Sequence, residues 1–285
     1  MSVIMVFTMF PALSSEAATN SWKSGDVTCK LSSSGTLTIS GNGAMANCEV
    51  VDGKVVAAPW YSKRASIYKI VVGDGVTHIG NFAFMDATNL ETIEFSDAGN
   101  LKSIGTQAFS NDFSIKGVSL PYGLISVGKY AFAYCSGAQT LLIPNTVKTL
   151  AYGCFYRMSS IVKVYIPASV TSIGDFAFGY NYKLAQVTGG AGVVAIGKQA
   201  FTFTYKLKVF KIASKKLKKI GSCCFYCSGL KTLYIQGTTK LTKKGVKNSL
   251  YLSSIKTVKV KKSKVKKYKK YFTKKNCKRK VKVKK

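Results

Sequence analysis

The stretch Val170-Thr171-Ser172-Ile173-Gly174-Asp175-Phe176-Ala177-Phe178 decides the fold, because versions of it recur along most of the chain. A small residue precedes its last phenylalanine, and an aliphatic residue lies five positions before it. Counterparts of this phenylalanine follow one another at intervals of 23 to 25 residues, at Phe84, Phe109, Phe132, Phe155, Phe178, Phe201 and Phe225. Self-similarity at one fixed period is typical of a solenoid, in which each repeat is a structural unit.

A second periodic segment has the form L-x-x-V-x-I, with a clean copy at Ile161-Val162-Lys163-Val164-Tyr165-Ile166. Its end alternates apolar and polar residues, which predicts a short strand. No unit buries its apolar side alone, so stacked units are expected to form one parallel sheet with the phenylalanines as an internal ladder behind it. The glycine that follows the aliphatic residue is expected to permit a tight bend.

The pattern V-T-x-I-G-x-x-A-F, complete at 170–178, resembles the BspA-type bacterial surface leucine-rich repeat. Residues 35–45 and 58–61 resemble the entry segment of that family, and the resemblance covers about residues 28–260. It implies a mainly β leucine-rich-repeat solenoid, with one parallel sheet, a short turn or helical segment per ~23-residue repeat, and a cap at both ends. It also implies a secreted or cell-surface protein, often one that mediates adhesion or host interaction.

The chain divides into four parts. An apolar run ending in Ser15-Glu16-Ala17 indicates a signal peptide over 1–17, without the usual positive start; the alternative is a buried N-terminal strand. Residues 18–66 are expected to form an N-terminal β cap in which Trp60 covers the first phenylalanine. The alternative is that Trp60 belongs to a carbohydrate-binding site. The solenoid covers 67–235. No segment has the length and apolarity of a membrane span.

Residues 236–285 are expected to hold a degenerate repeat and a lysine-rich C-terminal cap. Val265, Tyr268 and Phe272 share one helical face, whereas Val281 and Val283 alternate as in a strand. This pattern favours a folded strand–helix–strand cap, and the alternative is a disordered basic tail.

Charge is distributed unevenly along the chain. Residues 1–175 hold all 11 acidic residues and 12 basic ones, whereas residues 176–285 hold 31 basic residues and no acid. The basic end is expected to contact an anionic wall polymer or another polyanion; nucleic acid is disfavoured because no module that reads it is recognised. The predicted polyanion contacts are Lys261, Lys262, Lys266, Lys267, Lys269, Lys270, Lys278 and Arg279.

The outward columns of the sheet run from acidic (Glu91 and Glu94) through apolar and aromatic to basic. An open sheet face is a docking surface for a protein or glycan on a host or bacterial surface, with Tyr165 and Tyr234 as the type of residue that dominates binding. The alternative is that these are ordinary strand-forming residues. The predicted contacts on this face are Leu142, Tyr165, Lys208, Lys211, Lys231 and Tyr234.

Chemistry-bearing residues are sparse, so we expect no enzyme, cofactor or metal site. The single histidine, His78, occupies a variable position and is interpreted as a solvated surface residue. Cys154 and Cys224 take the small slot before phenylalanine and are expected to be buried, as are Cys135 and Cys227. Cys29 and Cys48 lie outside the repeats and are the candidates for a disulfide. The sequence leaves the oligomeric state open.

Overall fold

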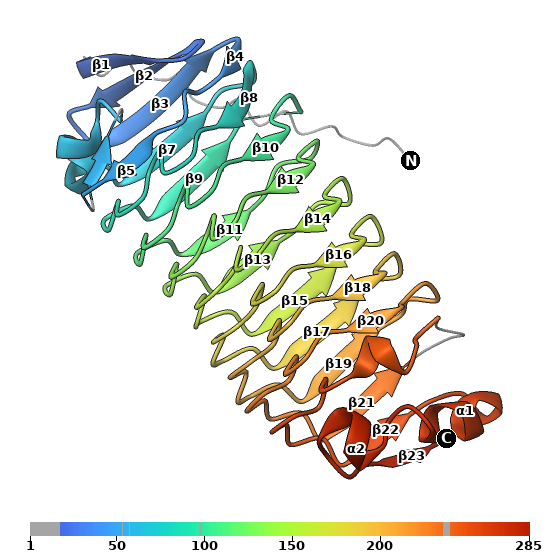
Figure 1. Ribbon diagram of the computed structural model, residues 1–285. Helices are drawn as coiled ribbons and strands as arrows, with labels where there is room; N and C mark the ends of the chain where they lie inside the picture. The colour runs from blue at the N-terminus through green and yellow to red at the C-terminus, as the bar shows by residue number, and fades with distance from the viewer. Residues whose placement is uncertain (1–17, 53, 57, 97–98, 236–239) are drawn as a thin grey trace, which may run out of the picture.

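The computed structural model describes residues 18–52, 54–56, 58–96, 99–235 and 240–285 of the chain. The predicted signal peptide, 1–17, lies outside these ranges. The described chain is a mainly β, parallel-sheet solenoid of about 9 coils with little helix, as predicted. Strands β1 to β3 lie at one end of the solenoid and the short helices α1 and α2 at the other (Figure 1).

The predicted sheet is formed by one strand from each coil. Where consecutive strands pair, they do so in parallel and in register, so that Val164, Val187 and Phe210 are direct neighbours. Their side chains point inward, whereas the residues between them face out. The strands are β7 (Lys69–Val72), β9 (Thr92–Phe95), β11 (Gly117–Ser119), β13 (Thr140–Leu142), β15 (Lys163–Ile166), β17 (Gln186–Gly189), β19 (Val209–Ile212) and β21 (Thr232–Ile235). Among the described residues the ladder is interrupted between β9 and β11 and between β13 and β15, so the one sheet predicted from the sequence is divided into three.

A second parallel sheet, which was not predicted from the sequence, runs along another side of the solenoid (Figure 1). Most of its strands are only two residues long, such as Ser103–Ile104, so no apolar–polar alternation marks them in the sequence. In every strand from β8 onward, the inward residue is the aliphatic one that precedes phenylalanine by five positions. The strands are β4 (Gly43–Ala44), β8 (Val76–Ile79), β10 (Ser103–Ile104), β12 (Ser126–Val127), β14 (Thr149–Leu150), β16 (Ser172–Ile173), β18 (Ala195–Ile196) and β20 (Lys219–Ile220).

The repeated phenylalanines form a continuous stack through the core. The Phe155 ring, which is fully buried, lies 6.1 Å from Phe132 and 5.5 Å from Phe178 between ring centroids. Trp60 extends this stack at its N-terminal end, with its ring 5.6 Å from that of Phe84. Its indole N–H donates to the carbonyl of Ala83 at 2.7 Å, and only 1% of the residue is exposed. The capping role predicted for Trp60 is therefore confirmed, and the carbohydrate-site alternative is wrong.

We call the five residues centred on each core phenylalanine a corner segment, for example residues 176–180. In Phe176, Phe178 and Tyr180 the backbone N–H groups donate to carbonyls of the next coil, at 2.8–2.9 Å. The first and last residues of each corner segment have positive φ, 55° at Phe176 and 61° at Tyr180. None of these left-handed positions, from Phe82 to Cys227, holds a β-branched residue, because such side chains strain that conformation most.

The glycine that follows the aliphatic residue serves a different purpose from the one predicted. Gly174 and Gly197 are absent from the positive-φ positions, so neither is needed for a bend. A Cβ at Gly197 would lie 2.4 Å from the backbone nitrogen of Asp175, and one at Gly174 would lie 2.7 Å from a backbone carbon of Ala151. These glycines are required because the backbone of one coil passes directly over that of the next.

The N-terminal end is covered by an antiparallel sheet. Strands β1 (Ala18–Ser24), β2 (Val27–Ser32) and β3 (Thr36–Gly41) pair in that order, and β3 then pairs in parallel with β7. A short hairpin, β5 (Glu49–Val51) with β6 (Lys54–Val56), and the 3-10 helix η1 (Tyr61–Ser66) follow before the first repeat. The cap thereby hydrogen-bonds the first edge of the solenoid, which would otherwise be free to pair with another chain.

The C-terminal segment is folded and has the predicted strand–helix–strand order. Strand β22 (Thr257–Lys259) pairs with β21 and with β23 (Lys282–Lys284). Between β22 and β23 lie η3 (Lys262–Lys264), α1 (Val265–Lys269) and α2 (Lys274–Cys277), with Tyr268 and Phe272 buried beneath them. The apolar pattern predicts this fold because it places buried residues at regular positions among lysines.

A further corner segment precedes this cap, in the region where the sequence indicated a degenerate repeat. Asn248 and Leu252 have positive φ, and Leu250 between them is fully buried in the place of a core phenylalanine. The N–H of Cys223 donates to the carbonyl of Asn248, and that of Cys227 to Leu252. The helix η2 (Lys244–Val246) leads into this segment. Because leucine replaces phenylalanine here, the sequence indicated a degenerate repeat without locating its corner segment.

All eight cysteines lie in the described ranges and are free thiols. Cys135, Cys154 and Cys224 are fully buried, as predicted, but Cys227 is half-buried because it takes a left-handed position whose side chain points outward. Cys29 and Cys48, the predicted disulfide candidates, are not joined. Burial, followed by the charge of Cys48, raises the pKa of Cys29 to about 12, so this thiol stays protonated and unreactive near neutral pH.

Candidate binding surfaces

The outward column of the main sheet brings together several of the predicted contact residues. Tyr165 on β15 pairs with Thr188, and the register continues through Lys211, Tyr234 and Lys259. Strands in one sheet lie about 4.8 Å apart, so Tyr165 and Tyr234 are separated by roughly 14 Å along the solenoid. This column is a continuous surface that passes from aromatic to basic residues.

Exposure along this column is uneven. Leu142 and Tyr165 have 62% and 63% of their surface exposed, so both side chains are available for contact with a partner. The Tyr165 ring lies over Gly189, where a Cβ would come within 2.9 Å of it. Tyr234 is half-buried, with the Lys259 ammonium 5.7 Å above its ring. Lys208 and Lys231 are exposed in the adjacent outward column, each immediately before its strand.

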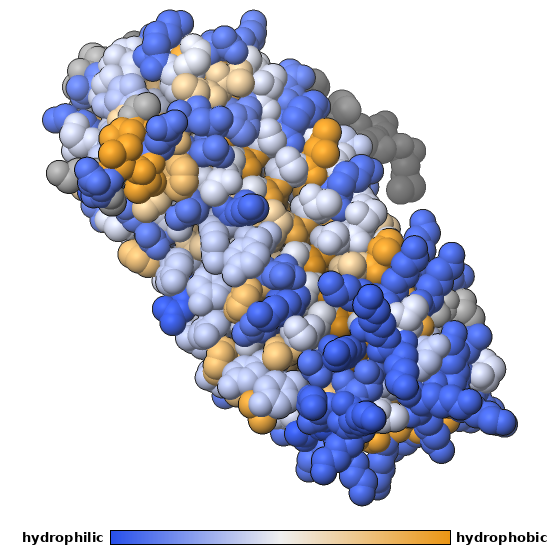
Figure 2. All heavy atoms as spheres, in the orientation of Figure 1, coloured by the Kyte–Doolittle hydropathy of each residue, from blue (hydrophilic) through white to orange (hydrophobic). Residues whose placement is uncertain are grey.

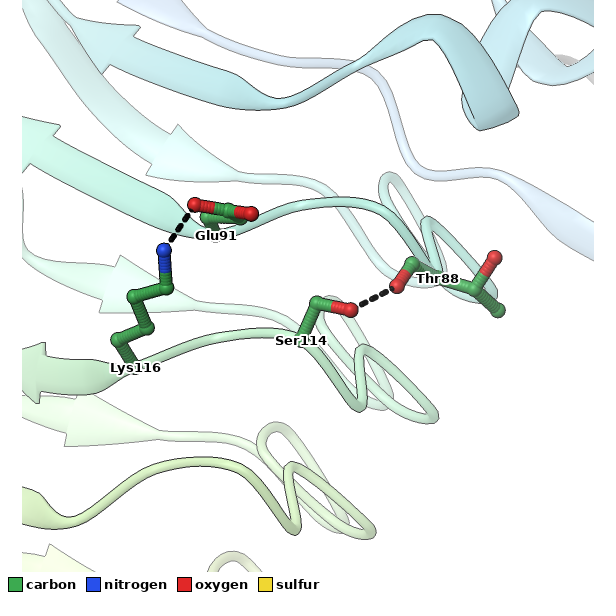
Figure 3. Close-up of polar contacts among 4 residues, drawn as sticks. All are labelled: Thr88, Glu91, Ser114 and Lys116. Carbon is green, nitrogen blue, oxygen red and sulfur yellow. Dashed lines mark hydrogen bonds and ion pairs between the residues drawn. The ribbon is translucent and has the colours of Figure 1, made fainter.

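The predicted acidic end of this face is neutralised by neighbouring lysines. Glu91 forms an ion pair with Lys116 of the next coil, as Figure 3 shows. Glu94 forms another with Lys69 of the preceding coil, at 2.7 Å. The same close-up shows the Ser114 hydroxyl donating to the carbonyl of Thr88 at 2.6 Å, which ties two adjacent turns together. The face therefore runs from charge-balanced to basic, rather than from acidic to basic.

The basic end is a broad lysine-covered surface, visible as the hydrophilic lower part of Figure 2. All seven lysines predicted as polyanion contacts are exposed. Arg279 is half-buried, and its Nε donates to the carbonyl of Ile255, so it serves the fold as well as the charge. In the described ranges the only ion pairs are those of Glu91 and Glu94, so no acid is paired with these lysines.

An open groove of about 530 Å³ lies within the basic end. Its lining combines four ammonium groups with side-chain hydroxyl and amide groups and contains no carboxylate, a donor-rich set suited to oxyanions. The residues are Lys243, Lys247, Asn248, Thr273, Lys275, Asn276 and Lys278. Of these, only Lys278 was predicted from the sequence, because the others are brought together only by the folding of the cap.

His78 is not the solvated residue that was predicted. Its Nδ1 lies 2.7 Å from the Ser103 hydroxyl, and its Nε2 lies 3.3 Å from Oδ1 of Asn47, so it links the cap to the first coils. Burial lowers its pKa, with the bond to Ser103 opposing that shift. No carboxylate orients the ring as a catalytic triad requires. In the described part of the chain no three acidic, cysteine or histidine residues gather as metal ligands.

The comparisons agree with this architecture. Two parallel ladders joined by stacked corner segments define a leucine-rich-repeat solenoid. A model of the BspA type leucine rich repeat region matches residues 56–185 and 152–278, in six copies. These matches cover most of the chain, which therefore belongs to the BspA-type leucine-rich-repeat family. No curated protein matches the chain.

The chain also matches several solved structures at low sequence identity. One from Eubacterium ventriosum is 19% identical, with 83% of this chain and 86% of that chain covered and a TM-score of 0.41. The T. pallidum leucine rich repeat protein is 23% identical, with 64% and 88% covered and a TM-score of 0.48. The pneumococcal vaccine antigen PcpA is 16% identical, with 84% and 81% covered and a TM-score of 0.41.

Across the described ranges, no helix is long and apolar enough to pass through a bilayer.

Proposed function

We propose that this chain is a secreted or cell-surface binding protein with two separate contact regions. The basic C-terminal end attaches to an anionic polymer such as that of a bacterial wall. The exposed sheet face then presents Leu142, Tyr165 and Tyr234 to a protein or glycan. The observation that carries the proposal is the uncompensated charge: 31 basic residues and no acid from residue 176 onward.

An excess of basic residues without acidic partners favours attachment to an anionic polymer and does not stabilise the fold. A surface of one sign attracts polyanions, and screening by salt weakens that attraction. The exposed lysines of α1 and the lysine-lined groove provide many weak contacts instead of one specific site. Membership of the BspA-type family supports a location outside the cell. A spacer held to the wall by charge alone is the second candidate, favoured if the sheet face has no partner.

The first test replaces Lys266, Lys267, Lys269 and Lys270 with glutamine. Binding to a poly(glycerol phosphate) polymer is measured by biosensor across a salt series. We expect weaker binding at every salt concentration, with the slope of log K against log salt reduced by up to about one for each lysine that contacts the polymer.

The control carries the same change in charge at the neutral end, at Lys23, Lys30, Lys63 and Lys129, all of which are exposed. It is expected to bind nearly as the natural chain does. Equal losses in both variants would show that net charge alone matters and would count against a dedicated basic end.

The second test concerns the sheet face. Replacing Tyr165 and Tyr234 together with alanine is expected to reduce binding to whole cells by roughly tenfold or more, since buried aromatic contacts dominate interfaces. The measurement is made in about 1 M salt, where the Debye length is about 3 Å and the basic end is screened. Tyr122→Ala is the control, because Tyr122 is 72% exposed but lies outside the sheet ladder. Identical binding of both variants would leave the spacer function as the better account.

A further inference from the structure

A second set of aromatic rings lies outside the core, on the corner segments. Neighbouring rings contact one another with centroids 4.6–6.3 Å apart, mostly tilted or edge to face. We call this set the outer aromatic array; it comprises Tyr130, Tyr134, Tyr152, Tyr156, Phe176, Tyr180, Tyr182, Phe203, Tyr205 and Tyr226. Several of its members occupy left-handed positions, which direct their side chains away from the core.

One arginine is inserted into this array. The guanidinium carbon of Arg157 lies 5.4 Å from the ring centroid of Tyr134 and 5.3 Å from that of Tyr180. Its Nε is buried and has no hydrogen-bond partner. Neither ion pair in the described ranges involves Arg157. The side chain is thus held between aromatic faces, while no carboxylate among the described residues pairs with its charge and its Nε lacks a hydrogen-bond partner.

A notch of about 220 Å³ opens beside this arginine. Four coils contribute the same repeat position to its rim: Phe113 and Tyr182 at the ends, with Ser136 and Ser159 between them. The two serines leave the space that rings fill in neighbouring coils. Tyr134 and Arg157 complete the lining, which contains no carboxylate.

The chemistry of the notch selects one class of ligand. A cation is repelled by Arg157, and an apolar ligand leaves its donors unpaired. A carboxylate accepts two parallel hydrogen bonds from a guanidinium, whereas the serine hydroxyls donate to or accept from other hydroxyl groups. Aromatic walls favour a ligand with a flat apolar face. The volume is below the range of about 300–1,000 Å³ for drug-sized ligands, so the notch suits a single ring.

We propose that this notch binds one carboxylated sugar residue, at the end or along the length of an acidic glycan. Arg157 takes the carboxylate, Ser136 and Ser159 meet ring hydroxyls, and Phe113 with Tyr182 packs against the C–H face of the sugar. The notch lies on the corner side of the coils, not on the strands that carry Tyr165 and Tyr234. The inference therefore does not rest on the function proposed for the sheet or for the basic end.

The test uses the full chain and small probes that carry a single carboxylate or few, because polymers would also bind the lysines. Sialyllactose and digalacturonate represent the two common sources of sugar carboxylate, and lactose is the neutral probe. Binding is followed by NMR titration, with saturation transfer from aromatic protons to the sugar. At least one acidic probe is expected to bind at least about tenfold more tightly than lactose.

Two variants have precedents within the chain and should fold. Arg157→Asn introduces the residue that Asn111 provides at the same left-handed position, and Tyr182→Ser introduces the residue of Ser136 and Ser159. Arg157→Asn is expected to reduce the affinity for the acidic probe at least about tenfold, so that this probe no longer binds more tightly than lactose. Tyr182→Ser is expected to reduce the affinity for both the acidic probe and lactose, and to remove the saturation transfer from aromatic protons to the sugar.

The glutamine variant of Lys266, Lys267, Lys269 and Lys270 separates this proposal from the charge-driven one. It is expected to leave binding of the acidic probes unchanged. The proposal is overturned if neither acidic probe binds, if Arg157→Asn keeps its affinity, or if glucose 6-phosphate binds more tightly than both carboxylated probes. Loss of binding in the lysine variant would overturn it as well, because the basic end would then be the site.

Discussion

Phe155→Ala is expected to lower the free energy of unfolding by about 3–5 kcal/mol, the range for removing a buried aromatic side chain. Phe155 sits in the middle of the core stack, with rings on both sides. Its loss therefore leaves a cavity between two coils whose stability depends on each other. Urea denaturation followed by circular dichroism measures the difference.

Phe155→Leu is the matched control, because Leu250 fills the same place in the last corner segment. We expect this variant to lose less than half as much stability as the alanine variant. Equal losses would mean that the slot requires an aromatic ring rather than apolar volume, contrary to what Leu250 indicates.

Asp112→Asn is expected to stabilise the protein at neutral pH by about 1–3 kcal/mol, the cost of an unsatisfied buried polar group. Asp112 is fully buried, and neither carboxyl oxygen has a hydrogen-bond partner of normal geometry. Burial raises its pKa well above the ordinary value, opposed by the backbone of Ala87 and assisted by the charge of Asp86. In the corresponding position Asn181 donates its amide to the carbonyl of Phe155 at 3.1 Å, and the amide introduced at position 112 is expected to reach the carbonyl of Phe84 likewise.

The effect of Asp112→Asn has a definite dependence on pH. Since the folded pKa is raised, the folded protein holds the proton more tightly than the unfolded chain does. The stability of the natural chain therefore falls as pH rises from about 4, the unfolded pKa, through the folded pKa. The advantage of the asparagine variant should be small near pH 4 and increase toward pH 8, measured by urea denaturation at both pH values.

Asn181→Asp provides the reverse experiment at the same repeat position, and it is expected to destabilise the protein more at pH 8 than at pH 4. An Asp112→Asn advantage that is the same at both pH values would rule out titration of Asp112 as its origin.

Most of the core was predictable from the sequence because it depends on residue type. The phenylalanine slot, the small slot before it and the L-x-x-V-x-I strand all demand apolar residues at a fixed period. The exception is Leu250, which is buried like the core phenylalanines but differs from them in residue type. The sequence therefore indicated only a degenerate repeat in this region and did not locate its core residue. The two-residue strands of the second sheet were missed because they are too short to alternate.

The candidate surfaces were harder to predict, since they depend on backbone conformation and on contacts between coils. Arg157 was not identified from the sequence, because only its left-handed backbone conformation places it between Tyr134 and Tyr180. The absence of β-branched residues two positions before and after each phenylalanine is the sequence signal for these outward positions. Similarly, neither the pairing of Glu91 with Lys116 nor the bonds of His78 follows from spacing alone.

The close stacking that Gly174 and Gly197 permit sets a constant spacing between successive coils along the solenoid. Adding or deleting one 23-residue coil moves everything beyond it by one strand spacing, about 4.8 Å. The separation between the Arg157 notch and the lysine-covered end can therefore change only in whole steps. A chain that gains or loses a coil changes how far its binding surfaces stand from whatever the basic end is attached to, while each surface keeps its own chemistry.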